Sequence, residues 1–192
     1  KLKVGSCLSF TWNEFRANDG KAGDGWDVDR YKRVLAKLGL KATYESEKFG
    51  KIIAGVESGK YAAGVSSVTV NADRMKRLYM TQPYYAVPNG YFVAKRSKYR
   101  HAADLDGKRI GSCADCSHEL YLKGQLEIPS VDITLNVKDP KIVAFETEAP
   151  GLVAASKGKI DAFLAADPVG LARIKEGEEL RELERLRDLC ER

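Results

Sequence analysis

The sequence contains no run of about 18 consecutive apolar residues, so it predicts no transmembrane helix. It also lacks a recognisable signal peptide, because it opens directly on a strand-like segment, Lys1–Ser6. We expect any export signal to have been removed or never to have been present. The net charge is +5, but Lys and Arg are mixed with Asp and Glu nearly everywhere instead of forming a stripe. That mixing argues against polynucleotide binding.

Cysteine is scarce, with four residues at positions Cys7, Cys113, Cys116 and Cys190. An even number permits two disulfides in an oxidising compartment, with three pairings, and the sequence does not choose between bridges and free thiols. Cys113, Cys116 and His118 form a Cys-x-x-Cys-x-His pattern that resembles a set of zinc ligands. No second Cys/His pair follows, so a disulfide or packed thiols are favoured, and we predict no metal and no cofactor.

The 192 residues are 44% hydrophobic, which suffices for one or two compact units with a buried core. An alternating strand at residues 1–7 is followed by a helix beginning at Trp26, where apolar residues recur at spacings of three and four. The helix–glycine–strand phrase at residues 51–67 recurs at 150–166. This alternation predicts an α/β fold of two lobes, each a mainly parallel sheet flanked by helices.

We predict lobe 1 over residues 1–88 and lobe 2 over residues 89–174, with a ligand-binding cleft between them. Residues 175–192 are rich in Glu, Arg and Leu and are predicted to form an exposed amphipathic helix. The leucines recur at intervals of three, at Leu180, Leu183, Leu186 and Leu189.

A cluster of hydroxyls and an arginine follows the strand of the first phrase. Ser66, Ser67, Thr69 and Arg74 lie within the stretch GVSSVTVNADR. Ligands of open parallel sheets bind beyond the carboxyl ends of strands, and backbone N–H groups at a helix start suit an anion. Arg74 can add a bidentate clamp on a carboxylate. The residues alone leave open a second interpretation, in which the serines cap a turn and the arginine is a surface cation.

Four blocks of the sequence resemble the amino-acid-binding family of bacterial periplasmic solute-binding proteins, the extracellular solute-binding protein family 3 with the type II periplasmic-binding fold. The most specific block is FGKIIAGVESGKYAAGVSSVTVNADRMKRLYMTQPYY, residues 49–85. The others are residues 23–39, 105–122 and 158–170. They occur in the same order as in the family and together span roughly residues 2–172.

The resemblance implies two lobes that close on a ligand by hinge motion. Carried over by position, it implies these ligand-binding residues: Phe10, Phe49, Ser66, Ser67, Thr69, Arg74, Ser117 and Asp167. Arg74 would bind the ligand α-carboxylate with help from Thr69, and Ser117 would reach the same group from lobe 2. Phe10 and Phe49 would flank the ligand as aromatic walls.

The sequence departs from the family pattern in three places. The acid expected to hold the ligand α-ammonium falls at Asp167, one residue later than usual, because Ala166 occupies the usual position. Asp115 stands where the family usually has glycine, which adds negative charge near the cleft. The chain also stops where family members cross back to lobe 1.

The resemblance implies a non-catalytic, monomeric receptor that works in the periplasm or outside the cell, with or without a lipid anchor. It would deliver an amino acid or related zwitterion to the membrane subunits of an ABC importer. The alternatives are a ligand-sensing module of a membrane receptor and, with less support, a dehydratase-type enzyme. No Ser-His-Asp or glutamate-based catalytic set is evident. Glu14, Glu146 and Glu148 are interpreted as surface charges, with the alternative that any of them contacts a cationic ligand. His118 is interpreted as facing either the ligand side chain or water.

Overall fold

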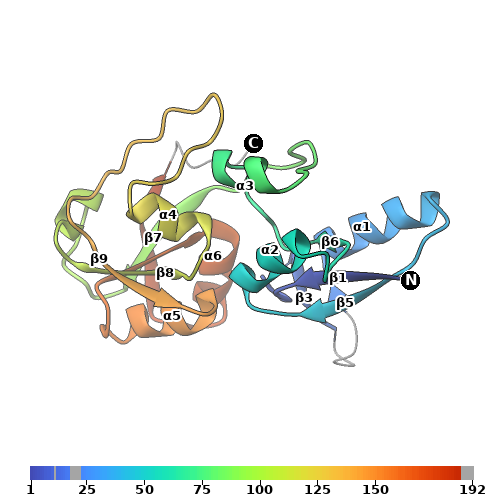
Figure 1. The fold of residues 1–192 in the computed structure, drawn as a ribbon. Coiled ribbons are helices and arrows are strands. Elements are labelled where there is room, and N and C mark those ends of the chain that lie inside the picture. The colour runs from blue at the N-terminus through green and yellow to red at the C-terminus, as the bar shows by residue number, and fades with distance from the viewer. Residues whose placement is uncertain (11, 18–22, 187–192) are drawn as a thin grey trace. The chain divides into compact units, whose positions relative to one another are not determined.

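The computed structural model describes residues 1–10, 12–17 and 23–186 (Figure 1). Contacts divide the chain into two compact units, Lys1–Thr69 (unit 1) and Val70–Arg192 (unit 2). This division lies earlier than the lobe boundary predicted at residues 88 and 89. None of the helices in the described part of the chain is long and apolar enough to cross a membrane.

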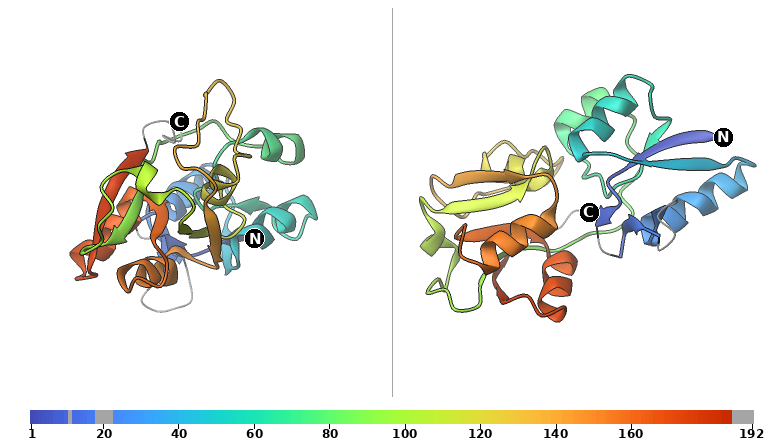
Figure 2. Two further views of the ribbon diagram at one scale, coloured as in Figure 1. Left: turned by 90° about the vertical axis from the view of Figure 1, so that its left-hand side faces the viewer. Right: turned by 90° about the horizontal axis from the view of Figure 1, so that it is seen from below.

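Unit 1 is built on a three-stranded parallel sheet in the order β5-β1-β6, with β1 at its centre. A small antiparallel sheet, β2-β3-β4, follows β1 in the chain. The elements are β1 (Leu2–Ser6), β2 (Ser9–Phe10), β3 (Glu14–Arg16), β4 (Gly23–Asp24), α1 (Trp26–Lys37), β5 (Ala42–Ser46), α2 (Phe49–Glu57) and β6 (Ala63–Gly64). Figure 2 shows α1 running beside β1 and β5. There the Tyr44 hydroxyl donates to the Val28 carbonyl oxygen at 3.3 Å.

Unit 2 contains a five-stranded sheet in the order β11-β7-β10-β8-β9. Its elements are α3 (Ala72–Arg77), β7 (Asn89–Ala94), the 3₁₀ helix η1 (Ala102–Leu105), β8 (Arg109–Cys113), α4 (Ser117–Leu122), β9 (Lys141–Phe145), α5 (Glu148–Ser156), β10 (Ala162–Ala166), α6 (Asp167–Lys175) and β11 (Leu180–Leu186). β8 is parallel to β9 and β10, whereas β7 is antiparallel to β10 and β11. The predicted α/β fold is thus confirmed, with an antiparallel edge added to this sheet.

Helices cover both faces of the unit 2 sheet. Phe92 and Phe163 are paired neighbours on β7 and β10, so their side chains lie on one face. Gly170 of α6 and Gly151 of α5 pack against these two rings: a methyl group at Gly151 would lie 1.9 Å from Phe163 Cε2. The opposite face carries Tyr91 and packs against α4 in a separate core cluster. Glycine at these two helix positions therefore lets α5 and α6 approach the sheet closely.

The helix predicted over residues 175–192 is wrong for the part that the structure describes. α6 ends at Lys175, and residues Leu180–Leu186 form the edge strand β11 instead. Leu180 and Leu186 are buried, while the intervening charged residues remain partly exposed. Backbone pairing with the open edge of β7 outweighs the helical spacing of the leucines, which is a weak local preference. Leu189 and Cys190 lie outside the described residues.

Candidate functional site

The two serines of the predicted site lie in unit 1 and bind carboxylates of the protein itself. The Ser66 hydroxyl donates to Glu14 Oε1 at 3.1 Å and accepts a hydrogen bond from the Cys7 backbone N–H at 3.0 Å. The Ser67 hydroxyl donates to Glu14 Oε2 at 2.9 Å. The Ser67 backbone N–H donates to Asp27 Oδ2 at 3.0 Å. Both hydroxyl protons therefore point at Glu14.

The interpretation of Glu14 as a surface charge is wrong. Its side chain is 1% exposed, and Asp27, which binds the Ser67 N–H, is 2% exposed. A buried carboxylate is tolerated only when hydrogen bonds replace its hydration. The two serine hydroxyls supply that replacement, and they hold the β3 hairpin against the end of β6. Ser67 has a φ of +47°, so the chain turns sharply where it leaves this network.

The remaining predicted residues of unit 1 lie near these elements. Phe10 ends β2, and Phe49 begins α2; both side chains are half-buried. Thr69, the last residue of the unit, is 5% exposed. The ligand roles that the resemblance implies for these three residues stay predictions.

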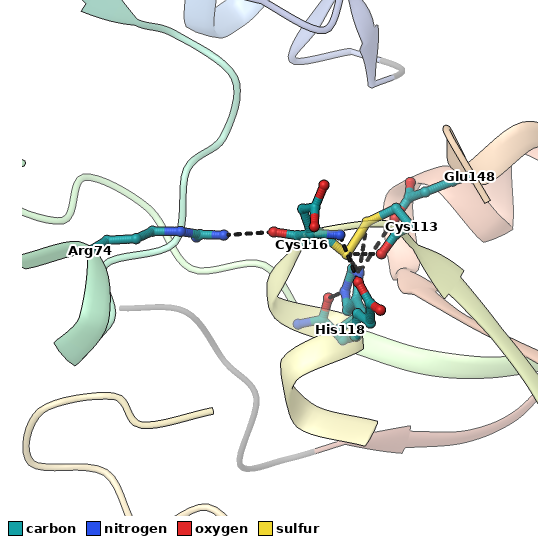
Figure 3. Close-up of a disulfide and its surroundings, with 8 residues drawn as sticks. Arg74, Cys113, Cys116, His118 and Glu148 are labelled. Atoms are coloured by element: carbon teal, nitrogen blue, oxygen red, sulfur yellow. Dashed lines mark hydrogen bonds and ion pairs between the residues drawn. A yellow bond between two sulfur atoms is a disulfide. The ribbon is translucent and has the colours of Figure 1, made fainter. Parts of the chain in front are cut away.

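Arg74 lies in α3 of unit 2 and is only 3% exposed. Asn71 caps this helix, because its Oδ1 accepts the Arg74 backbone N–H at 2.8 Å. The guanidinium extends to the turn that precedes α4, where Nη2 donates to the Asp115 carbonyl oxygen at 3.4 Å (Figure 3). The alternative of an exposed surface cation is therefore wrong: Arg74 is a buried cation directed at a helix N-terminus.

The turn before α4 is closed by a disulfide between Cys113, at the end of β8, and Cys116, the N-cap of α4. Between them Asp115 adopts a φ of +60°, in the left-handed region that favours glycine. This geometry accounts for the glycine usual at this position in the family, and aspartate is among the few residues that tolerate it. The Asp115 N–H donates to Glu119 Oε2 at 2.7 Å, and Ser117 starts the helix with 6% of its surface exposed.

Asp167 begins α6 at the carboxyl end of β10, which is parallel to β8. Asp167 and Ser117 therefore follow neighbouring strands at the same edge of the sheet. The Asp167 side chain is 2% exposed, and its Oδ2 lies 2.5 Å from Nε of Arg185 on β11. Burial, and then repulsion by Glu182, raise the pKa of Asp167, while Arg185 opposes the rise. Asp167 is thus already paired within unit 2.

His118 is 8% exposed, so it faces neither water nor an open surface. Its Nε2 lies 2.7 Å from Asn89 Oδ1. The Asn89 amide is oriented independently, because Nδ2 donates to the Val87 carbonyl oxygen at 2.9 Å. Asn89 therefore presents an oxygen to the imidazole, which places the ring proton on Nε2 and leaves Nδ1 as the acceptor.

Burial lowers the pKa of His118 to about 4 and outweighs the Glu148 carboxylate, 3.7 Å from Nδ1. The unfolded chain binds the proton with a pKa of about 6.5. As the pH falls from 6.5 towards 4, the unfolded chain takes up a proton at His118 and the folded chain does not. The free energy of unfolding is therefore highest above pH 6.5 and falls over this window. Over that window we expect His118→Gln to lose about 3 kcal/mol less stability than the original chain. Urea unfolding at several pH values measures the difference.

The matched control for this pH dependence is the other histidine of the chain. His101 is exposed, so His101→Gln shows the effect of the same substitution outside the buried cluster. Equal profiles for His118→Gln and the original chain would contradict a buried neutral imidazole.

Within unit 2 the structure brings Arg74 to the turn that leads into Ser117. Within unit 1 it brings Ser66 and Ser67 to Glu14. Sequence reasoning missed the carboxylate partners Glu14 and Asp27, and it missed Arg185 as the partner of Asp167. Asn71 could have been found, because an asparagine directly before a helical run is a recognised N-cap signal.

The model of one protein family, the bacterial extracellular solute-binding proteins, family 3, matches residues 2–185 of the chain. Among curated proteins, the chain is 28% identical over 137 residues to the "ABC transporter arginine-binding protein 1" of Escherichia coli K12, an alignment that covers 71% of this chain and 51% of that protein. It is 25% identical to the "Lysine/arginine/ornithine-binding periplasmic protein" of the same strain, covering 64% of this chain and 48% of that protein. The chain thus spans about half the length of the curated relatives it matches.

Solved structures show the same fold. The "substrate binding protein of an amino acid ABC transporter" superposes with a TM-score of 0.85 at 21% identity, covering 99% of this chain and 81% of that one. "An ancestral arginine-binding protein bound to arginine" gives a TM-score of 0.81 at 24% identity, covering 96% and 79% of the two chains. At these identities the similarity establishes the architecture.

Proposed function

The chain belongs to the bacterial extracellular solute-binding proteins, family 3, and from this membership we propose that it binds a small amino acid or a related zwitterion. We further propose that it works outside the cytoplasm and hands the ligand to the membrane subunits of an ABC importer. Binding and release are its whole task in this proposal, so no residue is assigned a catalytic role.

The buried guanidinium of Arg74 is the observation that carries the proposal. A cation that is 3% exposed needs anionic or strongly polar partners, because desolvating a charge is costly. Its Nη2 donates to the Asp115 carbonyl oxygen at 3.4 Å, which places the guanidinium at the turn that leads into α4. A ligand carboxylate offers two anionic oxygens in the geometry that a guanidinium prefers. The N-terminus of α4, beginning at Ser117, lies beside the same turn.

The names of the relatives support amino acids with a long or charged side chain as the first ligands to test. Those proteins are described as binding arginine, binding lysine, arginine and ornithine, and binding L-cystine. All of these ligands share the α-carboxylate and α-ammonium groups. We therefore propose that Arg74 binds the α-carboxylate, which all of these ligands share.

A thermal-shift screen tests the proposal. The full chain is heated with each of the twenty amino acids, ornithine and cystine, and at least one is expected to raise the unfolding midpoint. A ligand at 100 times its Kd stabilises the folded chain by about 2.7 kcal/mol. The matched control ligand lacks only the carboxylate: agmatine for arginine, or cadaverine for lysine. A screen in which no amino acid shifts the midpoint, or in which the decarboxylated amine shifts it equally, would contradict the proposal.

A further inference from the structure

Four potential metal-binding side chains meet at the turn between β8 and α4. The sulfurs of Cys113 and Cys116 and Nδ1 of His118 all lie within 4.8 Å of one another. Glu148, the first residue of α5, places Oε1 3.7 Å from the same Nδ1. Figure 3 shows these four side chains converging from β8, α4 and α5. Because Glu148 is only partly exposed and converges on this cluster, its interpretation as a simple surface charge is also wrong.

The histidine is oriented as a metal ligand would be. Its Nε2–H is used by Asn89, so the lone pair of Nδ1 faces the two sulfurs. Metal-binding histidines characteristically donate their second ring N–H to a protein oxygen, which fixes the tautomer and the ring orientation. The proposed function does not use this arrangement.

The spacing of the donor atoms suits a tetrahedral ion. Nδ1 lies 3.8 Å from Cys113 Sγ and 3.7 Å from Cys116 Sγ. With Zn–S bonds of about 2.3 Å and Zn–N bonds of about 2.0–2.1 Å, tetrahedral geometry separates nitrogen and sulfur ligands by about 3.6 Å. The two sulfurs are joined in the disulfide, and they would have to separate to about 3.8 Å to share a zinc ion.

We propose that reduction of the Cys113–Cys116 disulfide converts this cluster into a Zn²⁺ site formed by the two thiolates, His118 Nδ1 and Glu148. A dithiol or phosphine reductant supplies two electrons to the S–S bond, and the sulfurs take up two protons to become thiols. Zinc then displaces both protons and binds the thiolates. Disulfide and metal site exclude each other, since both use the same sulfurs. Two thiolates with an imidazole select zinc over the harder magnesium and calcium ions.

Cobalt spectroscopy on the full chain tests the proposal. Cys7→Ser and Cys190→Ser form the background, so that Cys113 and Cys116 are the only thiols. After phosphine reduction and anaerobic removal of the reductant, Co²⁺ is titrated in and then displaced by Zn²⁺. We expect one metal ion per chain, a thiolate-to-cobalt charge-transfer band, and visible bands of tetrahedral intensity. A weakly buffered indicator dye should record about two protons released per zinc ion.

Matched variants identify the other ligands. His118→Ala and Glu148→Gln are each expected to weaken Co²⁺ binding at least about 10-fold, with altered visible bands. His101→Ala and Glu146→Gln, their controls, should leave binding unchanged. Circular dichroism of the oxidised variants shows whether each one folds. The proposal is overturned if the reduced chain binds no more cobalt than the oxidised chain, or if His118→Ala and Glu148→Gln bind it as tightly as their controls.

Discussion

Replacing Arg74 with alanine is expected to weaken amino-acid binding by about 3 kcal/mol, roughly 150-fold. The guanidinium is 3% exposed, so a carboxylate bound to it is largely removed from water. Without the cation, that carboxylate would lose its hydration with no compensating charge. Arg74→Lys keeps the charge but not the planar pair of donors, and it is expected to restore only part of the affinity.

Calorimetric titration with the ligand found in the thermal screen measures the change. Arg77→Ala is the matched control, because Arg77 lies on the same helix but is exposed and pairs with Asp73 at 2.6 Å. Its affinity is expected to equal that of the original chain. If Arg74→Ala folds and binds as tightly as Arg77→Ala, the carboxylate site lies elsewhere. A failure confined to ligand binding would leave the zinc proposal untouched, because the zinc site does not use Arg74.

Local patterns of the sequence were enough to predict the fold class and the family. The helix–glycine–strand pattern is local, because the spacing of apolar residues and the glycine that ends the helix are read from neighbouring residues. It appears in the structure as α2 followed by β6 and as α5 followed by β10. The end of the chain could not be predicted in the same way. Its leucine spacing describes a helix, but β7 offers an open sheet edge that only the folded unit reveals. Pairing across a sheet is a tertiary choice that overrides such propensities.

In the candidate site, too, the features set by neighbouring residues could be predicted and those set by distant residues could not. Arg74 could be singled out from its neighbours in sequence, and its helix cap lies only three residues away. The partners of the serines could not, because Glu14 is separated from Ser66 by 52 residues and from Ser67 by 53. A glutamate in a polar hairpin has the composition of a surface residue. Its burial follows from the packing of β3 against the end of β6, which no local pattern records.

Glu14 is consequently the residue of unit 1 whose removal should have the largest effect. Glu14→Ala is expected to destabilise unit 1 by about 3 kcal/mol, because it leaves the buried Ser66 hydroxyl and the partly buried Ser67 hydroxyl without their acceptor. Glu14→Gln keeps the size of the side chain but presents an N–H₂ group to one hydroxyl. It is expected to destabilise unit 1 less than Glu14→Ala, because that hydroxyl can reorient and accept a hydrogen bond from the glutamine.

Urea unfolding measures both variants, with Glu45→Ala as the matched control in the same unit. Glu45 pairs with Lys3 at 3.3 Å, and both side chains reach solvent, Lys3 largely and Glu45 in part, so its loss should cost less than about 1 kcal/mol. Equal stabilities for Glu14→Ala and Glu45→Ala would show that the serine hydroxyls do not depend on the buried carboxylate.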